Sequence, residues 1–235
     1  MVVSEIAIFF GAHPFVRITH FGPGFSGFHC LRQRLRRPYN PLRIIYKNID
    51  RKHKNNFYDT IFPGRKKMYY GNIKNFDVAD GLGVRVSLFV SGCRNCCKGC
   101  FQPQTWDFCF GKEFSSDTEK EILELLAPSY IQGFSLLGGE PFEPENQAVL
   151  APFLERIKQI YPEKDIWCWT GYVFDKDLQP GQRKYTEYTE RMLRCMDVLV
   201  DGPFILEQKN LMLKFRGSEN QRLLHLKNGQ ITEIE

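Results

Sequence analysis

Long apolar segments are missing from this sequence, and its first residues lack the pattern expected of a secretory leader. No uninterrupted apolar run approaches the ~18–20 residues that a transmembrane helix needs. The first residues include Glu5 and contain no Lys or Arg before Arg17, so they lack the basic start of a secretory signal peptide. Histidine is scarce as well, since His225 is the only one after residue 67. These absences argue against membrane and secreted proteins, and we expect a cytoplasmic location.

Acidic side chains are rare in the N-terminal part. Residues 1–67 contain 13 Lys or Arg and 3 Asp or Glu, whereas residues 68–235 contain 19 and 24, so the net charge of +5 divides into +10 and −5. The basic character therefore belongs to residues 1–67 and gives no case for a nucleic-acid partner. We place a domain boundary there. Residues 1–67 are upstream sequence from a start assigned too early, with Met68 the real start, or a flexible extension, or a basic binding arm.

Residues 68–235 alternate between strand and helix patterns. Strand–helix alternation predicts parallel strands with right-handed crossovers and a functional site at their C-terminal ends. Because the segment is too short for eight such units, we expect an α/β fold that forms a partial, open (β/α) barrel. The expected elements are strands at 84–90, 134–137, 165–170 and 198–200, helices after a capping box at 116–119, over 144–160 and over 186–196, and a hairpin at 223–234.

Half of the eight cysteines lie within eight residues, directly after the first expected strand. A tight cluster in a chain without a leader is typical of metal binding in a reducing compartment. Cys93, Cys97 and Cys100 have the spacing C-x3-C-x2-C, so three thiolates on one loop would hold three corners of a cubane iron–sulfur cluster. One iron then stays open for substrate, as in catalytic zinc sites. Cys96 offers an alternative register, and its side chain should point away if Cys97 is the ligand.

Two other interpretations of the cysteine loop remain open. A structural zinc site needs a fourth ligand, and Cys96 or Cys109 is available for that place. An electron-transfer cluster with four protein ligands is the second alternative. Both describe a module that binds a metal without catalysing a reaction.

The cysteine loop resembles that of radical S-adenosylmethionine enzymes. Phe101 stands beside the last cysteine, and Gly99 precedes it as in one subgroup, the activating proteins of anaerobic ribonucleoside-triphosphate reductase. The resemblance covers residues 68–235 and none of 1–67. Six further motifs resemble that subgroup in the same order: DGLGVR at 80–85, QTW at 104–106, GGEP at 138–141, WTGY at 169–172, DVLVDGPF at 197–204 and FRGSENQR at 215–222.

This resemblance implies an oxidoreductase with an open barrel of the radical S-adenosylmethionine type. It implies a 4Fe–4S cluster on Cys93, Cys97 and Cys100 that cleaves S-adenosylmethionine reductively, with no catalytic residue separate from the cluster. The implied cofactor-binding residues fall on two turns, namely Gly99, Cys100 and Phe101 on the cysteine loop and Gly138, Gly139 and Glu140 after the next strand.

Each of the two turns has a defined expected role. Gly138 and Gly139 let the backbone approach the methionine group of the cofactor, and Glu140 accepts from its amine. The turn that contains Phe101 brackets the adenine, with the ring as an apolar face. The alternative for Phe101 is a place in the core.

The implied partner is the large subunit of anaerobic ribonucleotide reductase, which would lose a hydrogen from a glycine Cα. An external electron donor such as flavodoxin is also implied, and neither nucleic acid nor membrane is expected. Another radical S-adenosylmethionine enzyme, such as a formate-lyase activase, and a non-enzymatic metal module remain alternatives. The sequence leaves the roles of Asp201, Arg216 and Arg222 undecided, and it predicts that Trp169 and Tyr172 shape the core and the rim.

Overall fold

The structure is a computed structural model that describes residues 67–235. The interpretations of residues 1–67 therefore fall, apart from Lys67, outside the described residues. The strands are β1 Tyr69–Asp77, β2 Val84–Val90, β3 Lys112–Glu113, β4 Ile131–Gly138, β5 Asp165–Trp169, β6 Val198–Asp201, β7 Arg222–Lys227 and β8 Gln230–Ile234. The helices are α3 Ser116–Leu126, α4 Pro144–Ile160, α5 Phe174–Asp177 and α6 Thr189–Cys195, with short 3-10 turns at η1 Pro103–Trp106 and η2 Leu206–Gln208.

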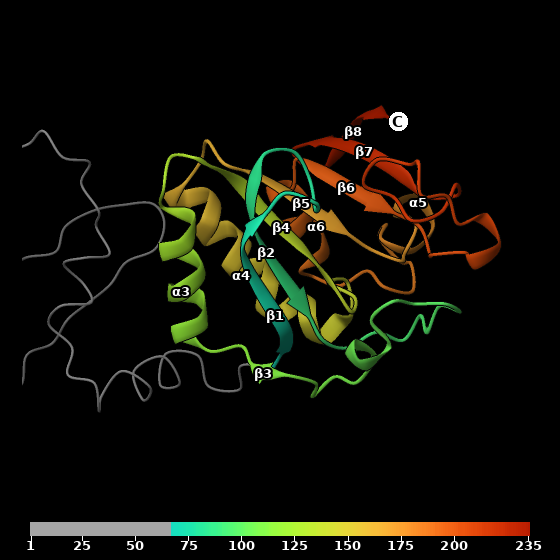
Figure 1. The fold of residues 1–235 in the computed structure, drawn as a ribbon, viewed down its shortest axis with the longest axis horizontal. Helices are drawn as coiled ribbons and strands as arrows, with labels where there is room; N and C mark the ends of the chain where they lie inside the picture. Colours follow the sequence, from blue (N-terminus) through green and yellow to red (C-terminus); the bar gives the residue numbers. More distant parts are fainter. Residues whose placement is uncertain (1–66) are drawn as a thin grey trace, which may run out of the picture. The chain divides into compact units, whose positions relative to one another are not determined.

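One sheet of eight strands organises the fold, and Figure 1 shows it fanning from β3 to β8. The strand order is β3-β1-β2-β4-β5-β6-β7-β8. The central strands β2, β4, β5 and β6 are parallel, while β1, β3, β7 and β8 pair antiparallel at the edges. Each crossover returns the chain to the same end of the sheet, so the C-terminal ends of the central strands meet at one edge. The α/β class is confirmed.

Helices α3, α4 and α6 form a layer on one face of the sheet. Phe153 of α4 packs edge to face against Phe134 of β4, with ring centroids 5.8 Å apart. The α3 helix contacts β2 and β4, and Arg191 of α6 pairs with Glu155 of α4 at 2.7 Å. Within residues 67–235, no helix is long and apolar enough to cross a bilayer.

The opposite face of the sheet is polar at its centre. Arg85 of β2 is fully buried there, pairs with Asp165 at 2.5 Å and donates to Ser135 Oγ at 2.6 Å. It also donates to Leu82 O at 3.0 Å, which holds the loop between β1 and β2 against this face. Gly81 in that loop has φ +117, and a Cβ there would lie 2.8 Å from the Arg85 side chain. The loop therefore requires glycine at this approach.

Two expected helix starts are wrong by one to three residues. The capping box lies one residue earlier than 116–119, because Ser115 is the N-cap and exchanges hydrogen bonds with Thr118. The helix expected over 186–196 begins at Thr189, whose hydroxyl accepts from the Thr186 N–H at 2.8 Å. At α3 the Ser115 side chain accepts from a free backbone N–H of the first turn, whereas at α6 the Thr189 hydroxyl accepts from an N–H of the turn before the helix, so residues 186–188 form a turn and not helix.

The hairpin is confirmed as β7 and β8, with Asn228 at φ 52 and Gly229 at φ 77 in its turn. Strands β1 and β3 were not predicted. In β1 only Tyr70 and Asp77 are buried, so its sequence shows no regular apolar alternation. It forms by pairing with β2, and β3 is only two residues long.

Candidate active site

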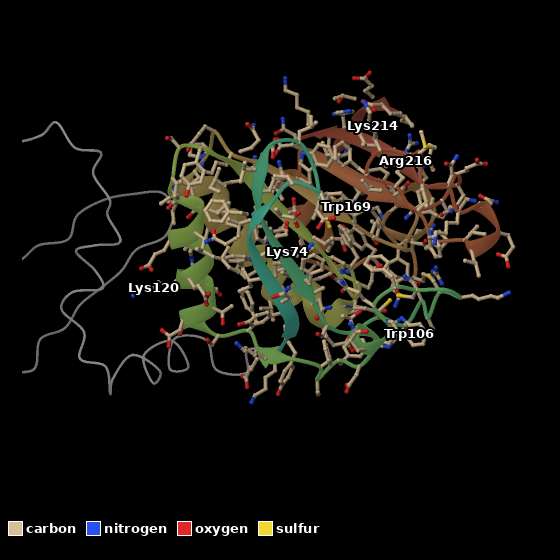
Figure 2. All side chains as sticks on the ribbon, viewed as in Figure 1. Lys74, Trp106, Lys120, Trp169, Lys214 and Arg216 are labelled. Atoms are coloured by element: carbon tan, nitrogen blue, oxygen red, sulfur yellow. The ribbon has the colours of Figure 1, made fainter. Side chains whose placement is uncertain are left out.

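A cavity of about 350 Å³ opens where the central strands end. Its walls come from the loops after β2, β4, β5 and β6 and from the loop between β1 and β2. Three bordering residues, Trp106, Trp169 and Arg216, are labelled in Figure 2. The lining residues are Asp80, Cys93, Asn95, Cys97, Cys100, Phe101, Trp106, Leu137, Gly138, Gly139, Glu140, Trp169, Thr170, Gly171, Gly202, Phe204, Phe215, Arg216, Gly217 and Gln221.

Three cysteines of one loop border this cavity. Cys93, Cys97 and Cys100 are half-buried and unpaired, whereas Cys96 is exposed and does not line the cavity. Cys96 has φ 46, and its Sγ lies 3.9 Å from Cys93 O, on the loop's own backbone. Within the described residues, no three Cys, His, Asp or Glu side chains are arranged to hold one metal ion. The three cysteines instead line one cavity, which suits a cluster that takes one thiolate per iron.

The surroundings of Cys93 and Cys97 raise the pKa of both thiols. Burial, together with the negative charge of Glu140, raises the pKa of Cys93 to about 12. Burial also raises the pKa of Cys97. A metal binds thiolates, so cluster binding at this loop must displace protons.

The glycine pair after β4 fastens the cysteine loop to the sheet. The Gly139 N–H donates to Val90 O at 2.7 Å, and the Glu140 N–H donates to Gly92 O at 2.9 Å. A Cβ on Gly138, which has φ +114, would lie 2.5 Å from Val90 N, and one on Gly139 would lie 2.8 Å from Gly92 O. Both glycines are therefore needed for backbone packing as well as for an open cavity wall.

Glu140 forms the floor of the cavity as a fully buried carboxylate. Its oxygens accept from Thr170 Oγ1 at 2.7 Å, the Gly171 N–H at 2.7 Å, the Phe142 N–H at 2.9 Å and Asn95 Nδ2 at 3.1 Å. All of these donors are neutral. Burial raises the pKa of Glu140 to about 7 despite the hydrogen bonds.

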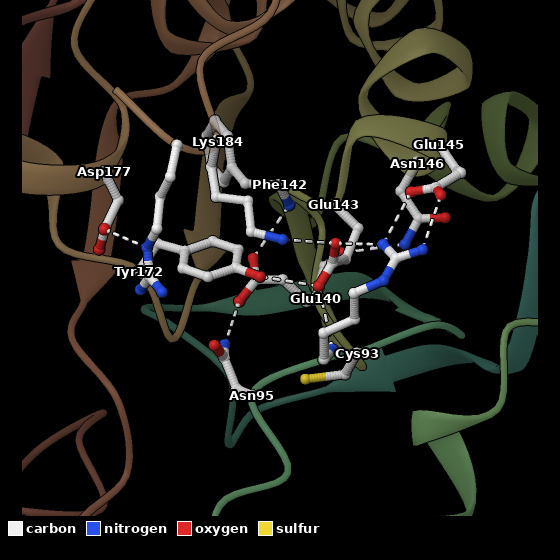
Figure 3. A network of polar contacts seen from close by, with 12 residues as sticks. Cys93, Asn95, Glu140, Phe142, Glu143, Glu145, Asn146, Tyr172, Asp177 and Lys184 are labelled. Carbon is white, nitrogen blue, oxygen red and sulfur yellow. Dashed lines mark hydrogen bonds and ion pairs between the residues drawn. The ribbon is translucent and has the colours of Figure 1, made fainter. Parts of the chain in front are cut away.

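Glu143, three residues further along the chain, pairs with two cationic side chains, Arg94 and Lys184, and Figure 3 shows Tyr172 and Lys184 pointing toward it. The carboxylate is fully buried and accepts from Tyr172 Oη at 2.7 Å and Lys184 Nζ at 2.8 Å. It also accepts from the Arg94 N–H at 3.0 Å and from Arg94 Nη1 at 2.6 Å. Burial alone would raise the pKa of Glu143, but these hydrogen bonds hold it below its ordinary value. Because Arg94 follows Cys93, Glu143 fixes the start of the cysteine loop.

A carboxyl pair lies at the outer wall. Burial and the neighbouring Asp77 raise the pKa of Asp80, which lines the cavity, to about 6. Burial opposes the shift at Asp77, but hydrogen bonds from Asp80 and the Ala79 N–H lower its pKa to about 2. Asp77 Oδ2 is buried without a hydrogen-bond partner, apart from an ion pair with Lys74 at 3.5 Å.

The predicted adenine-binding turn lies only partly at the cavity. Cys100 and Phe101 line it, whereas Gly99 does not. Gly99 has φ +77, and a Cβ there would lie 3.0 Å from the Leu206 side chain, so it serves packing against η2. The Cys100 N–H already donates to Cys97 O at 3.1 Å. The Phe101 ring is 86% exposed, so its alternative place in the core is wrong.

Asp201 and Arg222 form a structural pair away from the cavity. Arg222 donates twice to the buried Asp201 carboxylate, at 2.6 and 2.9 Å, and Asp201 also accepts from the Phe174 N–H at 2.8 Å. Asp201 therefore fastens α5 to the end of β6. The third undecided residue, Arg216, does line the cavity, as does Trp169.

Sequence reasoning missed Asn95, Thr170 and Glu143 as members of the site. Asn95 lies between two predicted ligands, and Thr170 lies inside the quoted WTGY motif, so position alone could have marked both. Glu143 follows the GGEP motif by two residues and carries no local signal. Its partners come from three distant segments.

Comparison with known proteins agrees with this geometry. A family model described as a 4Fe-4S single cluster domain matches residues 79–224. Proteins named anaerobic ribonucleoside-triphosphate reductase-activating protein are similar over most of their length. The one from Haemophilus influenzae is 45% identical over 147 residues, 62% of this chain and 90% of its own. That of Enterobacteria phage T4 is 41% identical over 158 residues, 66% of this chain and 93% of its own.

The protein from Escherichia coli strain K12 is 38% identical over 162 residues, 68% of this chain and all of its own. The chain belongs to this family of reductase-activating proteins. The family match at 79–224 includes every residue that lines the cavity. In this activating protein the cysteine loop, the GGEP turn and the WTGY motif therefore form one site.

Proposed function

We propose that this chain activates an anaerobic ribonucleoside-triphosphate reductase by cleaving S-adenosylmethionine reductively at a 4Fe–4S cluster. The product would be a glycyl radical on the reductase large subunit. The observation that carries the proposal is the shared cavity, in which three thiols of one loop face the glycine pair and the buried carboxylate of the next turn.

The thiols suit a 4Fe–4S cluster with one open iron. Cys93, Cys97 and Cys100 supply three ligands from one loop, and Cys96 turns away from the space between them. When bound and reduced, such a cluster supplies the electron that breaks a carbon–sulfur bond of S-adenosylmethionine. The protein contributes the anchored loop and excludes the solvent from its inner side.

The remaining wall offers places for the two ends of the cofactor. Gly138, Gly139 and Glu140 would hold the methionine group, with Glu140 facing its amine as a buried acceptor. Phe101 would cover the adenine with its exposed ring. The backbone of Gly99 and Cys100 would form the edge of the adenine site beside Phe101, although Gly99 itself does not line the cavity.

The substrate is proposed to be a protein segment that enters the cavity at the C-terminal ends of the central strands. In the described residues the cavity opens at the ends of β2, β4, β5 and β6, which supports an open barrel built on these four parallel strands. A glycine segment has no side chain to obstruct its approach to the cofactor. We further propose a cytoplasmic setting with an external electron donor such as flavodoxin.

The test is anaerobic incubation with the reductase large subunit, S-adenosylmethionine and a strong reductant. We expect a doublet radical signal in electron-spin-resonance spectra, and deuterium transfer into 5′-deoxyadenosine when the glycines of the subunit carry deuterium at Cα. Cofactor cleavage without deuterium transfer would indicate another radical S-adenosylmethionine enzyme, such as a formate-lyase-type activase. Absence of any cleavage by the iron-loaded protein would indicate a non-enzymatic metal module.

A further inference from the structure

The loop between β6 and β7 presents two apolar side chains to solvent. Leu211 and Met212 are 85% and 89% exposed, and they adjoin each other in sequence. Large apolar side chains that are this exposed, side by side, are unfavourable in water unless another surface covers them.

The two side chains project from a fixed frame. Lys209 pairs with Ser218 across the base of the loop. Asn210 accepts from the Met212 N–H at 2.9 Å through its side chain and donates to Glu219 at 3.1 Å. A tip held by such contacts loses little conformational freedom when it binds, so it is suited to recognition.

The inner end of the loop is anchored in the site. The Phe215 ring packs against Trp167 with centroids 5.0 Å apart, and Phe215 O accepts from Trp169 Nε1 at 2.8 Å. Phe215, Arg216 and Gly217 all line the cavity. The loop that carries Leu211 and Met212 therefore forms part of the wall of the cavity that a protein segment would have to enter.

The same loop is joined to the cysteine loop. Lys98 pairs with Glu207 at 3.3 Å, and Leu206 packs against Gly99. This pairing occupies the one acidic side chain in the segment from Leu206 to Arg216. Within residues 67–235, neither Lys209 nor Lys214 has an ion pair. The apolar tip is thus flanked by cationic side chains, and Figure 2 shows Lys214 and Arg216 near each other.

We propose that Leu211 and Met212 form a docking tip that inserts into an apolar recess with an acidic rim on the reductase large subunit. The proposal rests on the proposed function and names the surface that its protein substrate contacts. The tip would hold the reductase while its glycine segment reaches the cavity, so it acts in association and not in cofactor cleavage.

The experiment compares the full-length protein, Leu211→Asp and Met212→Asp. Ile234→Asp on β8 is the matched control, because Ile234 is also an exposed apolar side chain, at 55%. Binding to immobilised reductase large subunit is measured first, without S-adenosylmethionine. Iron content and cofactor cleavage in the absence of the reductase are measured in parallel.

We expect each tip variant to weaken binding about tenfold, a typical effect for a central interface side chain, and to raise the half-saturating reductase concentration for radical formation equally. Iron content, uncoupled cofactor cleavage and the Ile234→Asp variant should match the wild type. Wild-type affinity in both tip variants would overturn the proposal, as would failure of the wild type to bind. If the wild type binds and the tip variants do not, yet no glycyl radical forms, the docking tip stands and the proposed chemistry fails.

Discussion

Replacing Glu143 by Gln tests whether its cationic network holds the cysteine loop in place. The substitution keeps the side-chain shape and removes one negative charge from a fully buried position. Lys184 and Arg94 would then face a neutral amide, and because each Glu143 oxygen accepts from two donors, two of the four donors would meet an NH2 group in place of an acceptor. Glu155→Gln is the matched control, because it breaks a similar pair with Arg191 that is partly exposed and remote from the cavity.

The expected cost of Glu143→Gln follows from its burial. Removing one partner of a buried ion pair destabilises a protein by ~3–5 kcal/mol, because the remaining charge stays buried without compensation. Arg94 is half exposed and keeps its pair with Glu145 at 2.8 Å, so we place the effect near the lower limit, about 3 kcal/mol. An exposed pair contributes only ~0.2–1 kcal/mol, so Glu155→Gln should cost about 0.5 kcal/mol.

Urea unfolding of the iron-free protein at pH 7 measures this difference, and pH provides a second check. The folded pKa of Glu143 lies below its ordinary value, so its stabilisation is present above the ordinary pKa and is lost as pH falls toward the folded one. The difference in free energy of unfolding between wild type and Glu143→Gln should therefore reach its full value at pH 7 and be smaller at pH 4. Equal losses for Glu143→Gln and Glu155→Gln at pH 7, or a gap that widens in acid, would refute the reasoning.

Three further predictions concern the cavity. Anaerobic reconstitution should load about four irons per chain. The Cys96→Ala variant should keep most of this iron, whereas Ala substitution of Cys93, Cys97 or Cys100 should reduce the iron content to background. Gly139→Ala should cost ~1–3 kcal/mol in urea unfolding, because its Cβ would lie 2.8 Å from Gly92 O, whereas no change would show that the loop can move aside. The pKa of Asp80 is raised in the folded protein, so the folded state loses stability as pH rises from about 4 to 6. In thermal melts the Asp80→Asn variant should therefore have a higher Tm than the wild type at pH 7 but not at pH 4.

Local patterns were sufficient for the parts of the fold that have strong periodicity. The helix over 144–160 has the bounds expected from its apolar spacing, and the strand over 84–90 is buried on both faces as its β-branched run predicts. The position of the cysteines was also informative. They lie on a short loop directly after a parallel strand, and such a loop stays at the C-terminal end of the sheet, where the cavity lies.

Contacts between distant segments were not readable in this way. The buried Arg85 looks like an interruption of an apolar strand, and its explanation lies in Ser135 and Asp165, which belong to other strands. Strand β1 was likewise not readable from its own residues, because it forms by pairing with the neighbouring strand β2. Pattern reasoning describes which residues a segment buries, but it does not identify the partner that makes burial of a charge possible.

The two carboxylates after β4 illustrate how partners, and not residue type, decide chemistry at this site. Glu140 and Glu143 are three residues apart in the turn before α4 and are both fully buried, yet the pKa of Glu140 is raised and that of Glu143 is lowered. Glu143 is neutralised by Arg94 and Lys184, so its charge is already balanced and it serves the architecture. Glu140 has only neutral donors, and its charge is unbalanced until a cation enters the cavity. An ammonium group, such as the methionine amine of S-adenosylmethionine, would supply that cation, and this difference supports our proposal that Glu140 binds ligand while Glu143 positions the loop.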